Sequence, residues 1–478
     1  MFKKNKLYKF LIPLGLCLAV ISCKTPAIAP TKSGASVPES YASSKDTANS
    51  ATITWKTFFI DPELVNLIDV AIKNNQELLI TLQEIEIAKN DIRVRKGALL
   101  PTVGVKAGAG VEKVGRYTSQ GAGDASTEIM PGLEFPDPLQ DYTLAAYAHW
   151  EVDIWKKLRN SKKAAISRYL STIEGKNFVI TNLIAEVANS YYELLALDNQ
   201  LQIIRQTIVL QNNALDIVKV QKEAARATEL GVQKFQAEVL ASQSMEYEIL
   251  QKIKETENRI NFLLGRYPQE IKRSTSDFLG LPATLVNAGI PSQLLANRPD
   301  VKQAELELAA AKLDVKVARA EFYPSLDISA SYGIQAFKPS YLFTLPESLL
   351  YSLAGDLAAP LINRNAIKAE FKNANARQLQ ALYNYERTIL NAYLEVSNQL
   401  SKINNIEKSF TLKSKQVTAL NKSIEASNDL FKSARIDYFE VLMTQRDALE
   451  NKLELVDTKK EQLNASIQMY RNLGGGWK

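Results

Sequence analysis

Cysteine and histidine are scarce in this chain of 478 residues, which has two cysteines and a single histidine. Cys17 and Cys23 both lie near the start, so no disulfide framework can hold the rest of the chain together. His149 falls in a run of alternating apolar and polar residues, where a polar-face position is a simpler interpretation than a ligand role. The many carboxylates fall on expected solvated helix faces. We therefore expect no cofactor, no metal site and no enzymatic activity.

A strong excess of charge is also absent. The net charge is +6, and four lysines (Lys3, Lys4, Lys6 and Lys9) lie in the first 22 residues, which contain no acid. Without that segment the balance is close to neutral, which gives no reason to expect a nucleic-acid partner. The content of 46% hydrophobic and 23% charged residues is that of a folded protein with a core.

Long hydrophobic runs are missing as well, since the run before Cys23 has only 12 residues, "LIPLGLCLAVIS". A transmembrane helix needs about 20. The run follows basic residues, and "VISC" resembles a bacterial lipobox. We predict a lipoprotein signal peptide over 1–22 and lipid attachment at Cys23, the alternative being a plain secretory signal with an incidental cysteine. The Pro-, Ser- and Thr-rich segment 23–54 then forms a lipidated flexible tether.

Helix breakers are rare in two long regions. No proline occurs from Leu139 to Tyr267, and neither proline nor glycine occurs from Leu361 to Leu473. Each region is too long for one helix and predicts a hairpin of two, with a first arm of roughly 65 to 70 residues, about 100 Å. The turns are expected near 225–228 and 433–437, where Thr228 and Asp437 are good N-cap residues. Glu440 completes a capping-box spacing with Asp437.

The helical regions carry apolar stripes that step by four and three residues, a coiled-coil pattern. A soluble coiled coil accounts for the stripes but not for the strands described next. The first-arm stripe comprises Leu183, Val187, Ser190, Leu194, Leu197, Leu201, Ile204, Ile208, Gln211, Leu215 and Val218, and the stripe of the last arm comprises Leu449, Leu453, Val456, Lys460, Leu463, Ile467 and Tyr470.

Four runs alternate apolar with small or polar residues and predict strands over 102–118, 139–155, 325–338 and 347–360. Two of them follow a helical pattern directly at Pro101 and Pro324. Long strands with one apolar face and Tyr or Trp near their ends suit a membrane barrel wall, although a soluble β-sandwich would fit any single strand as well. Four strands cannot close a pore and open edges in lipid are prohibitive, so a barrel requires several chains.

The chain is internally duplicated. Asn74 and Pro101 recur 223 positions later as Asn297 and Pro324, and Leu264-Gly265 recurs 209 positions later as Leu473-Gly474. The change in offset places 14 extra residues in the first strand region. We predict a first repeat over 55–265, a linker over 266–297, a second repeat over 298–474 and a tail over 475–478.

Together these features resemble the bacterial outer-membrane factors, the TolC-like channels of efflux and secretion systems, in their lipoprotein branch. The resemblance is carried, in this order, by "WKTFFIDPELVNLIDVAIKNNQELL", "ALLPTV", "LLANRPDVKQAE", "FYPSL" and "YRNLGGGW". It implies a mainly α fold with membrane β-structure, in which three chains form a 12-stranded β-barrel on a 12-helix α-barrel. It also implies an outer-membrane location, a periplasmic adaptor as partner and an inner-membrane pump of the RND or ABC type.

Functional positions follow from the resemblance. The second turn constricts the pore in this family, which points to Asp437, Phe439, Met443 and Arg446. Related channels often carry Leu, then Asp, then Arg at the last three of these positions, so we expect an apolar plug here, unless Phe439 and Met443 pack between helices. The docking tips for the adaptor comprise Ala225, Arg226, Thr228, Gly231, Ser433, Ala434 and Arg435.

Two other classes compete with a passive exit duct. A periplasmic coiled-coil adaptor or scaffold lipoprotein would share the hairpins, but adaptors usually have one hairpin, whereas this chain has two hairpins and paired amphipathic strands. A lipid-anchored enzyme lacks a catalytic constellation in the sequence. The duct is therefore the leading hypothesis.

Overall fold

The computed structural model describes residues 28, 38–41, 50–273, 277–283, 286–360, 362, 364–433 and 435–477. Cys23 and Ala434 lie outside the described residues. The chain forms two compact units, each of which takes segments from both sequence repeats. One comprises Met1–Lys32, Ile87–Tyr169 and Leu306–Leu382, and the other comprises Ser33–Glu86, Leu170–Glu305 and Tyr383–Lys478.

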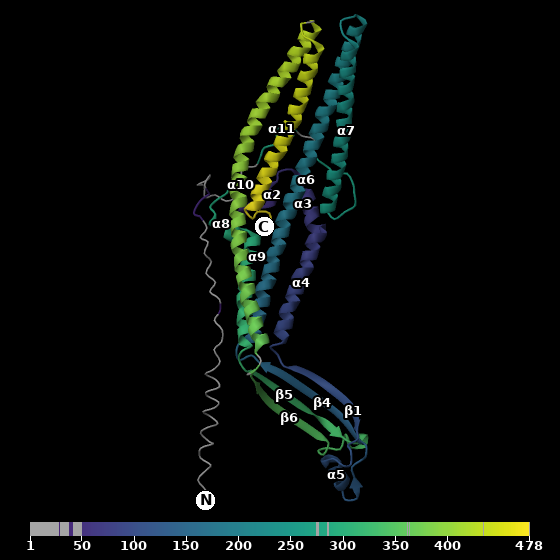
Figure 1. Cartoon of the computed structure of the whole chain (residues 1–478), viewed down its shortest axis with the longest axis vertical. Helices are drawn as coiled ribbons and strands as arrows, with labels where there is room; N and C mark the ends of the chain where they lie inside the picture. The colour runs from purple at the N-terminus through teal and green to yellow at the C-terminus, as the bar shows by residue number, and fades with distance from the viewer. Residues whose placement is uncertain are drawn as a thin grey trace. The chain divides into compact units, whose positions relative to one another are not determined.

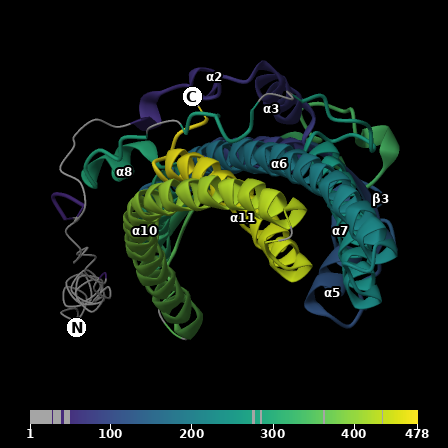
Figure 2. The same ribbon diagram turned by 90° about the horizontal axis from the view of Figure 1, so that it is seen from above.

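Two long helical hairpins dominate the described chain (Figure 1). The first pairs α6 (Lys157–Glu223, 67 residues) with α7 (Glu229–Leu263, 35 residues). The second pairs α10 (Asn365–Lys432, 68 residues) with α11 (Tyr438–Asn472, 35 residues). Figure 2 shows α11 beside α10 and α7 beside α6. The predicted hairpins, arm lengths and turn positions are confirmed.

Shorter helices precede the strands. Asp61 is the N-cap of α3, because its carboxylate accepts a hydrogen bond from the Glu63 N–H at 2.9 Å and Pro62 occupies the first helical position. These helices are α2 (Trp55–Phe58), α3 (Pro62–Asn74), α4 (Gln76–Gly97), α5 (Ser119–Ser126), α8 (Ser292–Asn297) and α9 (Pro299–Ala320), with 3-10 turns η1 (Ser50–Thr52) and η2 (Pro339–Tyr341).

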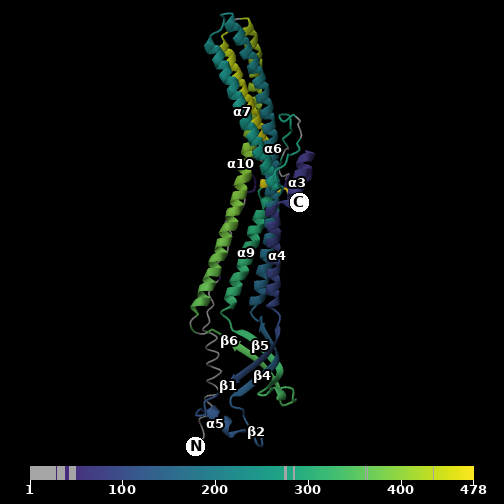
Figure 3. The same cartoon turned by 90° about the vertical axis from the view of Figure 1, so that its right-hand side faces the viewer.

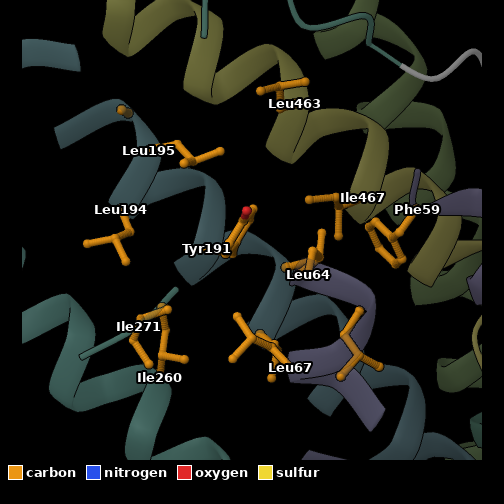
Figure 4. Packing of buried hydrophobic residues seen from close by; sticks show 14 of the residues in the cluster. Phe59, Leu64, Leu67, Tyr191, Leu194, Leu195, Ile260, Ile271, Leu463 and Ile467 are labelled. Carbon is orange, nitrogen blue, oxygen red and sulfur yellow. The ribbon is translucent and has the colours of Figure 1, made fainter. Parts of the chain in front are cut away.

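The largest hydrophobic cluster joins α3, α6, α7 and α11 in the second unit (Figure 4). Leu64 of α3, Leu194 of α6 and Ile260 of α7 are fully buried in it. The Tyr191 hydroxyl donates to the Asp61 carboxylate at 2.7 Å and so joins α6 to the start of α3. The predicted stripe of α6 is buried or half-buried along its whole length, as the coiled-coil pattern requires.

The segment predicted as a flexible tether is partly docked on this unit. Tyr41 is buried and stacks on Tyr393 of α10, with ring centroids 5.4 Å apart. Ser50 exchanges hydrogen bonds with Asn287, from the Ser50 N–H to the carbonyl at 3.0 Å and from the Asn287 N–H to the Ser50 hydroxyl at 2.9 Å. Burying an aromatic ring offsets the entropy lost on ordering these residues.

The first unit contains a four-stranded antiparallel sheet (Figure 3). Its strands follow the order β1 (Thr102–Glu112), β4 (Leu139–Val152), β5 (Ser325–Ala336) and β6 (Leu349–Ala358). The register places Val105 opposite Ala146, Ala146 opposite Tyr332 and Tyr332 opposite Tyr351. Since side chains alternate along a strand, the apolar sets of all four strands lie on one face. This face is broadly exposed, from Val105 on β1 (74%) to Tyr351 on β6 (77%).

The strands are shorter than the predicted ranges, because loop residues and a helix cap end them early. After β1 the segment turns, and Thr118 caps α5 by accepting from the Gly121 N–H at 3.1 Å. The 14 extra residues thus belong to a loop that holds α5 and the short pair β2 and β3. The strands are β1 (Thr102–Glu112), β2 (Glu128–Met130), β3 (Leu133–Glu134), β4 (Leu139–Val152), β5 (Ser325–Ala336) and β6 (Leu349–Ala358).

Among the described residues, none of the helices combines the length and the apolar character that a membrane crossing requires.

Candidate functional site

Each helix-to-strand junction is marked by its proline. α4 ends at Gly97 and β1 begins at Thr102, directly after Pro101. Likewise, α9 ends at Ala320 and β5 begins directly after Pro324. Proline lacks an N–H and disfavours helical geometry in the residue before it, so the helical ladder stops at these points.

Two tryptophans, one near the end of β4 and one just after it, each donate a hydrogen bond to one of the two junctions. The Trp150 indole N–H donates to the Leu99 carbonyl at 3.1 Å, and that of Trp155 donates to the Pro324 carbonyl at 2.8 Å. Trp155 also stacks on Tyr323, with centroids 4.7 Å apart. Both carbonyls lie in the short segments between helix and strand, beyond the ends of α4 and α9, and the indoles supply hydrogen-bond donors to them. The sequence signal for this role is the pair of tryptophans that closes the second alternating run. The alternation alone does not reveal that their indoles bond to the junction carbonyls.

Asp153 links the end of β4 to the start of α6. Its carboxylate accepts from the Leu158 and Arg159 N–H groups and from the Arg159 guanidinium, each at 2.9 Å. Burial disfavours the charged form, but these hydrogen bonds outweigh it and hold the pKa of Asp153 below its usual value.

His149 lies on the polar face of β4, as the alternation predicts. Its Nε2 is 3.6 Å from the Asp327 carboxylate.

The first hairpin tip is a tight Schellman turn. Ala225 adopts a left-handed backbone (φ 55°), and the Arg226 N–H donates to the Gln221 carbonyl at 2.8 Å. Thr228 caps α7 by accepting from the Gly231 N–H at 3.2 Å. These four predicted tip residues (Ala225, Arg226, Thr228 and Gly231) therefore lie within one turn, and Ala225 and Arg226 are exposed.

The second tip repeats this backbone pattern, since the Arg435 N–H donates to the Leu430 carbonyl at 2.9 Å. The Ser433 hydroxyl donates to the Asp429 carbonyl at 2.8 Å. Asp437 occupies the N-cap position of α11 as predicted, but its side chain makes no cap hydrogen bond, so the expected capping box is wrong. The carboxylate instead stands exposed at the tip.

The predicted gate residues follow Asp437 on α11. Phe439 is 46% exposed, and the Lys234 ammonium of α7 lies 5.0 Å from its ring centroid, a cation–π contact. Met443 is half-buried and Arg446 is exposed. Within one chain Phe439 thus lies outside the buried tip core rather than inside it.

The two tips pack against each other beneath these exposed residues. The Tyr438 ring lies over Gly231, where a Cβ would be in van der Waals contact with the ring at 3.4 Å. The packing brings a predicted docking residue, Gly231, next to the predicted gate stretch. The tip cluster contains Ala214, Leu215, Val218, Val232, Phe235, Val239, Phe431, Val441 and Leu442.

The described residues include no group of three or more histidine, cysteine or carboxylate side chains arranged to hold a metal ion. The features with functional geometry are instead the tips, the junctions and the exposed apolar sheet face.

The family model described as "Outer membrane efflux protein" matches residues 67–266 and 290–475. The chain belongs to this family. It is 29% identical over 97% of its length to the pyoverdine export outer membrane protein OpmQ of Pseudomonas aeruginosa, of which 96% is covered. It is 26% identical to the probable outer membrane lipoprotein SilC of Salmonella typhimurium, over 93% of each chain.

The fold agrees with this membership. A crystal structure of the CusC channel superimposes with a TM-score of 0.82 at 22% identity, covering 95% of this chain and all of that one. The predicted class, an outer-membrane efflux channel, is confirmed, and the adaptor alternative is set aside. The family is one of transport proteins rather than enzymes.

Proposed function

We propose that three copies of this chain form the exit duct of a tripartite efflux system, through which small molecules pass passively across the outer membrane. The observation that carries the proposal is the four-stranded sheet with one exposed apolar face and two open edges, β1 and β6. A second face lined by polar and small residues suits a water-filled interior.

The two open edges of the sheet, β1 and β6, require further β-strands as pairing partners. In hydrocarbon, each unpaired N–H or C=O costs several kcal/mol, so lipid-exposed sheet edges do not occur. Because β1 and β6 sit at opposite edges, β6 of one copy can pair with β1 of the next and continue the ring. Four strands from each of three chains then close a single barrel, as in the outer-membrane factors that the sequence resembles.

Semi-native gel electrophoresis of outer-membrane fractions tests this proposal. We expect a band of about three chain masses in unheated detergent samples that collapses to the monomer on boiling. A chain that stays monomeric without heating, or that fractionates with soluble periplasmic proteins, would contradict the duct.

The hairpin tips fit a docking site for a periplasmic adaptor. Ala225 and Arg226 are exposed at the first tip, and Ser433 and Arg435 at the second. Small side chains there permit close approach of an adaptor's own hairpins. The adaptor would link the duct to an inner-membrane pump of the RND or ABC type, which supplies the energy and selects the cargo.

The gate is proposed at the start of α11. Phe439 and Met443 lie four residues apart and Arg446 three further on, so the three share a helix face. Three copies would bring their apolar side chains together, and such constrictions can close by dewetting. The exposed Asp437 carboxylate would add an acidic ring near the tip.

The anchor is proposed at Cys23. Acylation there would tie the N-terminus to the outer membrane, in agreement with the lipoprotein named among the relatives.

A further inference from the structure

Arg298 binds both helices of the second hairpin at its base. Its guanidinium donates to the Glu395 carboxylate of α10 at 2.7 Å and to the Asn472 carbonyl at the end of α11 at 2.8 Å. The Asp300 carboxylate fixes the plane of the group, because it accepts two further hydrogen bonds, from Nε at 3.0 Å and from Nη2 at 2.7 Å. The Arg298 side chain is only 6% exposed, whereas the carboxylate side chain of Glu395 is 41% exposed, so the guanidinium is buried while one of its partners remains in contact with solvent. We call these four residues the base clasp.

The first repeat has a simpler arrangement at the same place. Asn75, the counterpart of Arg298, donates to the Leu263 carbonyl at 3.0 Å, and Leu263 is the counterpart of Asn472. The other hydrogen bond of the Asn75 side chain is local, because its Oδ1 accepts from the Leu78 N–H at 3.0 Å. Glu186, the counterpart of Glu395, is exposed on α6. At this position the first hairpin is thus held at one helix and the second at both. A different guanidinium, that of Arg273, joins the helices of the first hairpin by bonding to Asp198 of α6 and Glu257 of α7.

The backbone around the two positions is equivalent, which makes the comparison direct. Gly265 and Gly474 each have a positive φ and lie against the carbonyl of Asn74 or Asn297, where a Cβ would come within 2.3 and 2.5 Å of the oxygen. The difference between the repeats therefore lies in the side chain at 75 and 298 and in its partners.

We propose that Arg298 is a positioning residue that sets the tilt of the α10–α11 hairpin and so the resting aperture at its tip. This inference rests on the proposed trimeric duct and on the gate at the start of α11. A planar guanidinium that bonds to both helices fixes their separation and direction at the base, whereas a single bond to one helix leaves a rotation free. In the repeat that carries the proposed gate, the guanidinium of Arg298 joins α10 to the end of α11 itself.

The length of α11 amplifies small changes at the clasp. Its 35 residues span about 52 Å at 1.5 Å per residue, from Asn472 at the base to Tyr438 beside the gate. A tilt of about 5° over that length displaces the tip by roughly 5 Å. A change of this size compares with the width of a side chain, so it suffices to open or close an apolar constriction.

Distances between the tips of neighbouring protomers test the proposal without relying on conduction. A spin label on Glu440→Cys, an exposed position of α11, reports these distances by pulsed electron paramagnetic resonance on the full chain in detergent. Arg298→Gln should lengthen or broaden the distance distribution by several ångströms, roughly the tip displacement above. Arg298→Lys keeps the positive charge but lacks the planar guanidinium with its several donors. It should therefore change the label distances less than Arg298→Gln does. The matched control is Asn75→Ala, which removes the corresponding bond of the first repeat and should leave the label distances unchanged.

Glu395→Gln provides an independent arm, because it removes one charge from the clasp while keeping an acceptor, and it carries the test if Arg298→Gln does not fold. Unchanged distances in both Arg298→Gln and Glu395→Gln would overturn the positioning role, as would an equal change in Asn75→Ala. If the parent protein itself gives no interprotomer distance, the trimer fails rather than the clasp. A normal parent distribution with altered variants, but unchanged conductance, would uphold the clasp and locate the gate elsewhere.

Discussion

At Pro101 and Pro324 the backbone changes from helix to strand within a few residues, and individual side chains make that change possible. The prolines could be predicted from the sequence, because a missing N–H has the same consequence in any fold. The bonds from Trp150 to Leu99 and from Trp155 to Pro324 could not, since their partners lie 51 and 169 residues away. The alternating pattern of β4 fixes which face a residue occupies but not which carbonyl it reaches.

Trp155→Phe isolates the indole hydrogen bond. Phenylalanine keeps an aromatic ring beside Tyr323 but cannot donate to the Pro324 carbonyl, and the loss of such an exposed hydrogen bond costs about 0.5 to 1.5 kcal/mol. We expect a lower thermal midpoint for dissociation of the folded assembly in detergent. Tyr323→Leu, which removes the stacking instead, serves as the comparison. A Trp155→Phe protein that melts like the parent would show that the hydrogen bond contributes nothing.

At the scale of elements, the two hairpins were the most predictable part of the chain. Long stretches without proline and glycine, a 209-residue repeat offset and N-cap residues at matching positions determine helix lengths and turns together. The base clasp at Arg298 escaped prediction because its partners Glu395 and Asn472 lie 97 and 174 residues away. The strand ends were also misplaced, because loop residues and the cap of α5 end β1 six residues before the predicted limit.

Bulk at the first tip should impair docking. Ala225→Gln enlarges an exposed side chain in a left-handed position that already carries a Cβ, so the turn itself is retained. A docking loss of about 1.4 kcal/mol would lower adaptor affinity about tenfold. We expect reduced efflux in cells with normal trimer amounts. Ala225→Gly, which suits the positive φ, is the matched control and should export normally. Normal efflux in the glutamine variant would argue against tip contact.

Removing the proposed plug should enlarge the pore. Phe439→Ala combined with Met443→Ala takes away the apolar side chains, and we expect a higher single-channel conductance in planar bilayers. Asp437→Asn should mainly lower cation selectivity, because three negative charges are lost. Leu230→Ala, at a 59% exposed apolar position on α7 of the same tip, is the matched control. Conductance equal to that of the parent, with trimers intact, would place Phe439 and Met443 in helix packing.

In the proposed duct, the whole molecule depends on a feature that no single chain completes, the closure of the sheet. Alternation along each strand predicts the apolar face, and the observed register aligns the four faces, but the number of copies follows from family resemblance rather than from contacts within the chain.

Part of the N-terminal segment is more ordered than its sequence predicts. Its composition predicts a free tether, whereas Tyr41 is buried against Tyr393.

Lipid attachment should depend on one residue. Cys23→Ala should abolish incorporation of labelled fatty acid, because removal of the predicted signal peptide would take away Cys17, the other cysteine of the chain. Since the barrel supplies its own hydrophobic surface, trimers should still reach the outer membrane. Labelling that persists in the variant would refute the anchor.

Native mass spectrometry of the complex extracted from outer membranes tests the central claim most directly. A sheet with two open edges that spans lipid must be closed by further copies, so we predict a single species of three acylated chains that releases monomers only on harsh activation. A stable monomer, or a complex with any other number of copies, would contradict the account of this protein as a trimeric exit duct.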